Sequence, residues 1–121
     1  MGWLNRLRGG RSSSGGAVRH RVVNGVDTTA VRAHCERFVA TRRGVEAYVE
    51  PATNVTASTI VLIAHDGEWT RRAVPSRQAG FQLGQLLGIP VYDVNQTGYP
   101  GRMREWNSRQ RHQDRTDGTA G

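Results

Sequence analysis

The sequence predicts an α+β fold in which two helices cover one face of an antiparallel sheet. Three observations indicate this class. Apolar residues recur at helical spacing in two segments, and they alternate or run together at strand length in four others. Asp66-Gly67, a strong hairpin signal, joins two of the strands. The expected order is α-β-β-β-α-β, a three-stranded meander followed by a helix and a short fourth strand packed beside it.

The first helix is expected to begin after Asp27, whose carboxylate suits an N-cap, and to end at Gly44. Apolar residues three or four positions apart form its core side: Val31, Cys35, Phe38 and Val39. The second helix is expected after Ser76 and ends at Gly88. Its core side follows the same spacing: Ala79, Leu83, Leu86 and Leu87. Gly80 and Gly84 weaken a helix interior, so this strip predicts close packing of another segment.

Four segments have strand character. Residues 45–50 alternate between apolar and polar side chains, which predicts a half-buried strand. Residues 56–65 are β-branched and apolar on both faces toward their end, which predicts a central strand. Residues 69–74 follow the hairpin turn, and residues 91–94 form the short fourth strand.

The chain of 121 residues suffices for one domain, expected over residues 26–107. Residues 1–25 are expected to form a flexible basic arm, because residues 9–16 have the Gly/Ser composition of a linker. Residues 108–121 are polar and are expected to be a disordered tail. No apolar run is long enough to cross a bilayer, and a cytoplasmic location is the default expectation.

The net charge of +7 is carried by arginine alone, with 17 basic and 10 acidic residues. GC-rich codon usage accounts for the absence of lysine, but it does not account for the excess of positive charge. That excess predicts an anionic partner: RNA, DNA, an acidic protein or an anionic membrane surface.

Basic residues lie near aromatic ones in the second half of the chain. Phosphate contacts combined with base stacking need this mixture. We therefore predict a non-enzymatic module that contacts RNA or a ribonucleoprotein through Arg71, Arg72, Arg77 and the region from Arg102 to Arg115. The main contacts are expected from the following residues: Arg71, Arg72, Arg77, Tyr99, Arg102, Arg104, Trp106 and Arg109. The alternative is a solvated basic face with two core aromatic residues. One contiguous positive face from Arg77 to Arg102 would favour RNA binding, and scattered charge would weaken it.

The N-terminal arm carries Trp3, Leu4 and Leu7 on one side at helical spacing. The element is too short to be a stable helix in isolation. Docking to a partner protein is the alternative function that it suggests. A weak peripheral membrane contact and folding back onto the chain's own domain also remain open.

An enzyme is the least favoured interpretation, because no catalytic or metal motif is complete. His65, Asp66 and Glu68 cluster at the hairpin turn, but no activated nucleophile accompanies them. Catalysis would need a pocket that gathers His65 and Asp66 with Tyr92 and Asp93. Cys35 is the only cysteine and lies on the core side of its helix. We predict no cofactor and no metal.

Four stretches carry a family resemblance: Val45-Glu-Ala-Tyr-Val-Glu-Pro, Val61-Leu-Ile-Ala-His-Asp-Gly-Glu-Trp-Thr-Arg-Arg, Gly88-Ile-Pro-Val-Tyr-Asp-Val and Tyr99-Pro-Gly-Arg-Met-Arg-Glu-Trp-Asn. Together they resemble a family of small, uncharacterised actinobacterial proteins, some of which carry an automatic oxidoreductase label. The resemblance implies no functional residues. Glycines spaced by four inside a helix do not form the Gly-x-Gly-x-x-Gly turn of a dinucleotide site.

The expected order of elements also resembles the double-stranded-RNA-binding domain, which has a helix, a three-stranded meander and a second helix. That resemblance implies recognition of A-form RNA by shape, with a basic N-terminus on the second helix. Arg71, Arg72 and Arg77 would supply the basic residues there.

Overall fold

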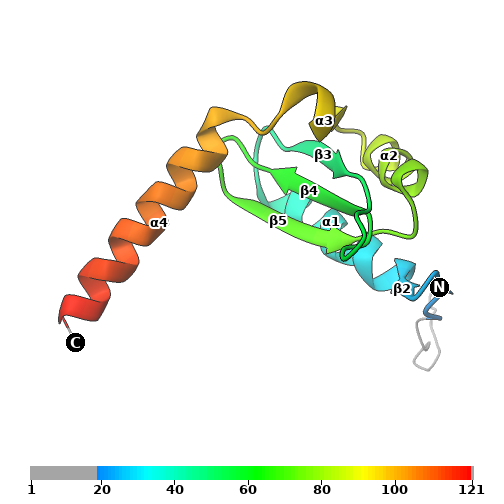
Figure 1. The fold of residues 1–121 in the computed structure, drawn as a ribbon, viewed down its shortest axis with the longest axis horizontal. Helices are drawn as coiled ribbons and strands as arrows, with labels where there is room; N and C mark the ends of the chain where they lie inside the picture. The colour runs from blue at the N-terminus through cyan, green and yellow to red at the C-terminus, as the bar shows by residue number, and fades with distance from the viewer. Residues whose placement is uncertain (1–18, 121) are drawn as a thin grey trace, which may run out of the picture.

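The structure is a computed structural model that describes residues 19–120, with side chains to residue 115 (Figure 1). The elements are β1 (Val22–Val23), β2 (Val26–Asp27), α1 (Thr28–Thr41), β3 (Glu46–Glu50), β4 (Thr59–Ile63), β5 (Trp69–Ala73), α2 (Arg77–Leu86), β6 (Val91–Asp93), α3 (Val94–Thr97) and α4 (Gly101–Ala120). The α+β class is confirmed. The predicted order from α1 to β6 is present, with a hairpin before it and two helices after it.

Four strands form the main sheet in the order β5-β4-β3-β6. The meander β3-β4-β5 is antiparallel, and β4 lies centrally as predicted. Strand β6 pairs parallel to β3, with Tyr92 opposite Tyr48. A parallel neighbour needs a crossover, and helix α2 supplies it.

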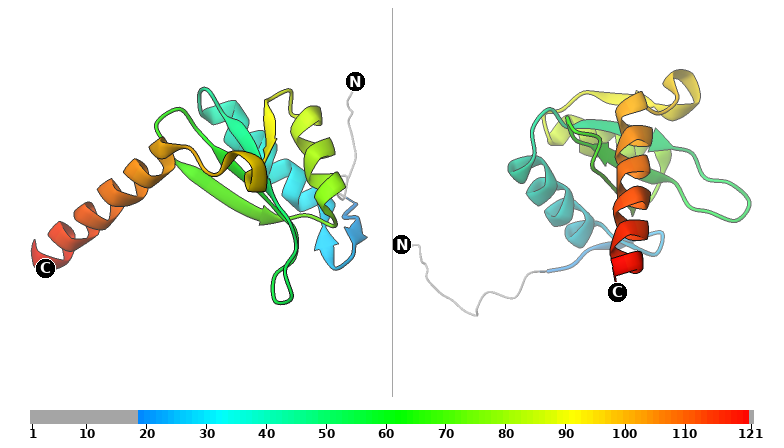
Figure 2. Two further views of the ribbon diagram at one scale, coloured as in Figure 1. Left: turned by 45° about the horizontal axis from the view of Figure 1, so that its top comes forward. Right: turned by 90° about the vertical axis from the view of Figure 1, so that its left-hand side faces the viewer.

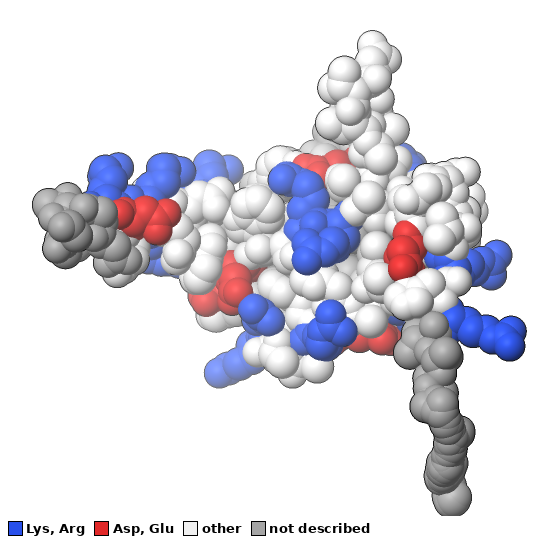
Figure 3. All heavy atoms as spheres, turned by 90° about the horizontal axis from the view of Figure 1, so that it is seen from below, with Lys and Arg blue, Asp and Glu red and all other residues white. Residues whose placement is uncertain are grey.

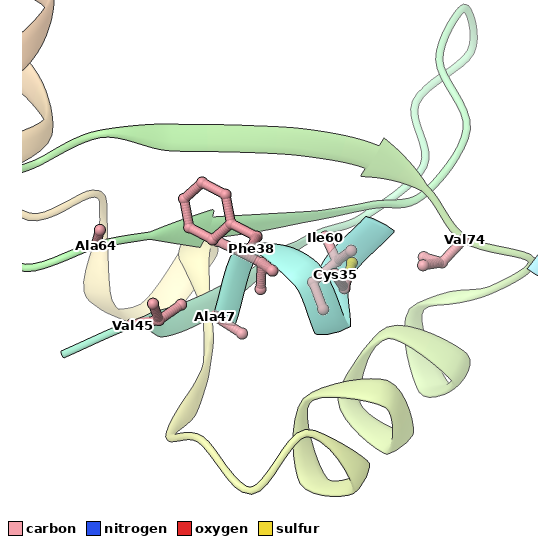
Figure 4. Close-up of a cluster of buried hydrophobic side chains, with 8 residues drawn as sticks. Cys35, Phe38, Val45, Ala47, Ile60, Ala64 and Val74 are labelled. Atoms are coloured by element: carbon pink, nitrogen blue, oxygen red, sulfur yellow. The ribbon is translucent and has the colours of Figure 1, made fainter. Parts of the chain in front are cut away.

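Helices α1 and α2 cover one face of the sheet, as expected. Cys35 and Phe38 of α1 pack against Ala47 and Leu62 of the strands (Figure 4). Cys35 has no exposed surface, and burial raises the pKa of its thiol to about 11. A β-carbon on Gly84 would lie 2.8 Å from the β-carbon of Val91, so the glycine strip of α2 faces the sheet.

The opposite face of the sheet carries a second apolar cluster. Tyr48, Val61 and Ile63 point to this side and are buried beneath Met103 of α4. Half-buried residues complete the cluster: Trp69, Tyr92, Val94 and Tyr99. The first turns of α4 are therefore part of the core and not a surface appendage.

Two of the predicted boundaries are wrong. Residues 108–120, expected to be disordered, continue helix α4, which projects away from the sheet (Figures 1 and 2). The docked first turns provide the nucleus, and each further residue then adds one helical hydrogen bond. Residues 22–25, expected to belong to a flexible arm, form the β1-β2 hairpin, whose Asn24 side chain donates to the Pro75 carbonyl at 3.1 Å.

Candidate nucleic-acid interface

The eight residues predicted to contact nucleic acid do not form one site. Arg71 and Arg72 are neighbours on β5, so their side chains leave opposite faces of the sheet. Arg77 begins α2, whereas the remaining arginines lie on α4. The other predicted contacts, Trp3, Leu4 and Leu7, lie outside the described residues.

Arg71 is engaged with its own sheet. Its guanidinium donates to both carboxylate oxygens of Glu50, at 2.8 and 3.0 Å. It also lies 5.0 Å from the centre of the Trp69 ring, a cation–π distance. Arg71 therefore stabilises the edge of the meander. Two of its N–H donors are already used within the protein.

Arg77 is neutralised at the start of α2. Its guanidinium pairs with Asp93 and lies 4.9 Å from the centre of the Phe81 ring. The hydrogen bond from Arg77, and then that from the backbone of Asn95, hold the pKa of Asp93 below its usual range. A double-stranded-RNA-binding domain would use a basic residue at the N-terminus of this helix. Here the charge of that residue, Arg77, is already paired with Asp93.

Arg102 anchors α4 to the sheet. It donates to a carboxylate oxygen of Glu46 at 2.6 Å and to the Ala64 carbonyl at 2.9 Å. The hydroxyl of Tyr48 donates to the same oxygen of Glu46 at 3.0 Å. Burial, reinforced by this hydrogen bond, raises the pKa of Tyr48 to about 12. Arg102 is therefore a structural residue, and only about a quarter of its side chain is exposed.

Three further side chains hold α4 in place. Tyr99 packs in the second apolar cluster, and Trp106 is half-buried beside Gly67. Arg109 donates to the Asp66 carbonyl at 2.7 Å and lies 5.8 Å from the centre of the Trp106 ring. The two aromatic residues are thus committed to the junction between the helix and the sheet.

Arg72 lies beside His34 on the α1 side of the sheet. Its Nη2 is 3.4 Å from Nδ1 of His34, and Nε2 of His34 is 2.8 Å from the hydroxyl of Thr70. Partial burial lowers the pKa of His34, and the positive charges of Arg72, Arg37 and Arg42 lower it further. A neutral imidazole is thereby favoured at a locally positive position.

Basic side chains predominate in the view of Figure 3, with acidic side chains between some of them. Arg32 pairs with Glu36 at 3.1 Å, and Arg42 pairs with Glu68 at 2.7 Å. Arg77 and Arg102 are each bound to a carboxylate as well, which reduces the net positive charge at both ends of the surface between them.

Helix α4 places three arginines of the predicted region from Arg102 to Arg115 on one side. Arg104, Arg111 and Arg115 lie seven and four positions apart, so at 100° per residue they form one row along the helix. Arg102 and Arg109 leave the other side and contact the sheet and the hairpin turn. Figure 3 shows basic side chains following one side of the projecting helix. The spacing of these three arginines can be read from the sequence. It indicates a shared side only if the segment is helical, and residues 108–121 were expected to be disordered.

Residues considered for catalysis are spread over the sheet. His65 and Asp66 follow β4 at the end where Ile63 pairs with Glu46, whereas Asp93 pairs with Val49 three residues along β3. Glu68 is held by Arg42 through two hydrogen bonds. Among the described residues, no group of three or more His, Cys, Asp or Glu side chains is placed to hold a metal ion.

No protein-family model, curated protein or solved structure matches this chain. Within the part of the chain that the structure describes, no helix combines the length and apolar character needed to span a bilayer.

Proposed function

We propose that this protein is a non-enzymatic module that binds RNA through the α4 arginine row, defined as Arg104, Arg111 and Arg115. The observation that carries the proposal is the placement of this row. It lies on the side of a projecting helix that faces away from the sheet. All three side chains are exposed.

Arg104 and Arg111 differ in charge balance from three of the other predicted arginines. Arg71, Arg77 and Arg102 each have a carboxylate within ion-pair distance. In the described part of the chain, no carboxylate forms an ion pair with Arg104 or Arg111. A cation that is not neutralised internally remains available to an external phosphate, which an arginine binds through two parallel hydrogen bonds.

The geometry suits a polyanion. With a rise of 1.5 Å per residue, the row extends over about 16 Å, a length along which a duplex presents several phosphates. RNA is favoured over DNA because its unpaired bases are accessible and guanidinium groups also stack on them. Phosphate contacts carry no sequence information, so we expect binding with little sequence preference.

The proposal is tested by fluorescence anisotropy with a labelled RNA hairpin of mixed sequence, titrated with the full chain at several salt concentrations. Three phosphate contacts predict that affinity falls roughly 40-fold between 50 and 200 mM salt, through counterion release. A DNA duplex of equal length is the comparison and should bind more weakly. Undetectable RNA binding at 50 mM salt, or affinity independent of salt, would contradict the proposal.

A further inference from the structure

A groove lies between helices α1 and α2, next to the β1-β2 hairpin. Its volume is about 730 Å³, within the range of roughly 300–1,000 Å³ typical of ligand-binding pockets. Apolar side chains from both helices, from β2 and from the end of β1 line much of it: Val23, Val26, Val31, Ala79, Leu83 and Leu86. We call this surface the α1–α2 groove.

The groove exposes apolar surface at one wall. Ala79, Leu83 and Leu86 lie four and three positions apart on α2, so they form one line along that helix. Leu86 is 63% exposed, which is high for a leucine next to other apolar residues. A concave apolar surface between two helices is the kind of site that receives a short amphipathic segment.

The chain enters the described structure at the edge of this groove. Arg21 lines it, and the hydroxyl of Thr29 on α1 accepts a hydrogen bond from the Arg21 amide at 3.1 Å. The same hydroxyl donates to the Arg19 carbonyl at 3.2 Å. These contacts fix residues 19–21 against the first turn of α1. The 18 preceding residues therefore start beside the groove.

Those preceding residues include a segment of matching chemistry. Trp3, Leu4 and Leu7 are apolar residues of that stretch that helical spacing would place on one side. Eleven residues, rich in Gly and Ser, separate Leu7 from Arg19. A chain of this length and composition spans about 20 Å, so the segment can reach the groove.

We infer that the α1–α2 groove is the docking site of residues 3–7 of the same chain. Trp3 supplies the largest apolar surface, and an aromatic side chain of this kind buries roughly 150–250 Å². Covalent attachment makes the contact intramolecular, with an effective concentration in the millimolar range for a short linker. Weak intrinsic affinity is therefore sufficient for the groove to be occupied. Because the contact is apolar, it should persist at salt concentrations that abolish RNA binding.

Limited proteolysis of the full chain tests this inference. Trypsin cleaves after Arg6, inside the docking segment, and after Arg11, in the linker, so the second site is an internal control. Docking should slow the initial cleavage after Arg6 roughly tenfold relative to that after Arg11, as measured by mass spectrometry. Leu86→Glu should remove this protection, whereas Val55→Glu should leave it unchanged. Val55 is 90% exposed in the β3–β4 loop and does not line the groove.

Amide chemical shifts provide the second measurement. Trp3→Ser in the ¹⁵N-labelled full chain should shift amides lining the groove, such as those of Ala79 and Leu83, and few others. Equal cleavage rates after Arg6 and Arg11, or unchanged groove amides, would overturn the inference. Protection that increases with protein concentration would also overturn it, because it would assign the docked segment to a second copy of the chain. RNA titrations of Leu86→Glu keep the two proposals separate, since the α4 arginine row does not include the groove.

Discussion

Gly67, in the turn between β4 and β5, lies directly against the carbonyl group of Arg102 at the start of α4. Its φ of +94° belongs to the left-handed region, and a β-carbon there would overlap the Arg102 oxygen and approach the β-carbon of Trp106 to 2.9 Å. The turn thus needs glycine for its conformation and for the close approach of a helix. That approach sets the direction in which α4 leaves the sheet.

Gly67→Ala should therefore destabilise the protein and loosen α4. The left-handed conformation alone costs roughly 1–2 kcal/mol for a residue with a side chain, and the overlap with Arg102 adds to it. Gly25→Ala is the matched control, because Gly25 also has positive φ (+77°) but open space around it. Urea unfolding should show a larger loss for Gly67→Ala than for Gly25→Ala. Equal losses would mean that the helix contact contributes nothing.

Substitutions of Arg102 and Arg104 should have different effects, one on stability and the other on RNA binding. Arg102→Gln removes the contacts to Glu46 and Ala64 and should lower the free energy of unfolding by about 1–2 kcal/mol. Arg104→Gln should leave the unfolding midpoint unchanged, because the hydrogen bond from its side chain to the Tyr99 carbonyl is long at 3.5 Å. It should weaken RNA binding instead. Loss of stability in Arg104→Gln would contradict this division of roles.

Asp93 should make stability depend on acid pH. Its folded pKa lies below the ordinary value of 3.8, through Arg77 first and the Asn95 amide second. A lowered folded pKa contributes stability that is complete above the unfolded pKa and is lost as the pH falls through the folded pKa. Urea midpoints between pH 6 and pH 2.5 should therefore fall less steeply in Asp93→Asn than in the parent chain. Identical pH profiles would show that the Arg77 pair does not stabilise the fold.

Cys35 should be inert while the protein is folded. With no exposed surface and a pKa of about 11, its thiol has a thiolate fraction on the order of 10⁻³ at pH 8. Labelling by Ellman's reagent should be slow in buffer and rapid in denaturing urea. Rapid labelling without denaturant would show that α1 separates readily from the sheet.

Local sequence signals predicted the part of the fold from α1 to β6. Asp27 caps α1 by accepting a hydrogen bond from Ala30 at 2.9 Å, and Ser76 caps α2 by accepting one from Ala79 at 3.1 Å. The Asp66-Gly67 turn joins β4 to β5 as expected. Capping and turn signals operate within a few residues, so they can be read without knowledge of the tertiary structure.

The second apolar layer depends on tertiary contacts and could not be predicted in the same way. Met103 is the only residue of α4 that is buried among those whose side chains are described. Tyr99 and Trp106 lie at helical spacing from it, but this spacing does not show which surface of the protein they cover. The polar composition after Ser108 suggested disorder. Composition alone does not show that the first turns of α4 pack on the sheet and so provide the nucleus for the rest of the helix.

The sequence could not show which of the predicted arginines pair with carboxylates of the same chain. The partners of Arg77 and Arg102 are Asp93 and Glu46, which lie 16 and 56 residues away. Proximity of basic and aromatic residues in the sequence was a poor guide, since Trp106 packs at the helix junction. The spacing along α4 shows which arginines share one side of the helix, but only once the segment is known to be helical.

The most direct measurement compares two triple variants in RNA anisotropy titrations across a salt series. One variant replaces the α4 arginine row with glutamine at positions 104, 111 and 115. The other makes the same replacement at Arg37, Arg43 and Arg72, which removes an equal charge from the α1 side. The proposal predicts that the first variant loses most RNA affinity and that its salt slope falls by about 2–3, while the second keeps its affinity within about threefold and its slope unchanged. Equal losses in both variants, with circular dichroism showing intact folds, would contradict the assignment of RNA binding to α4.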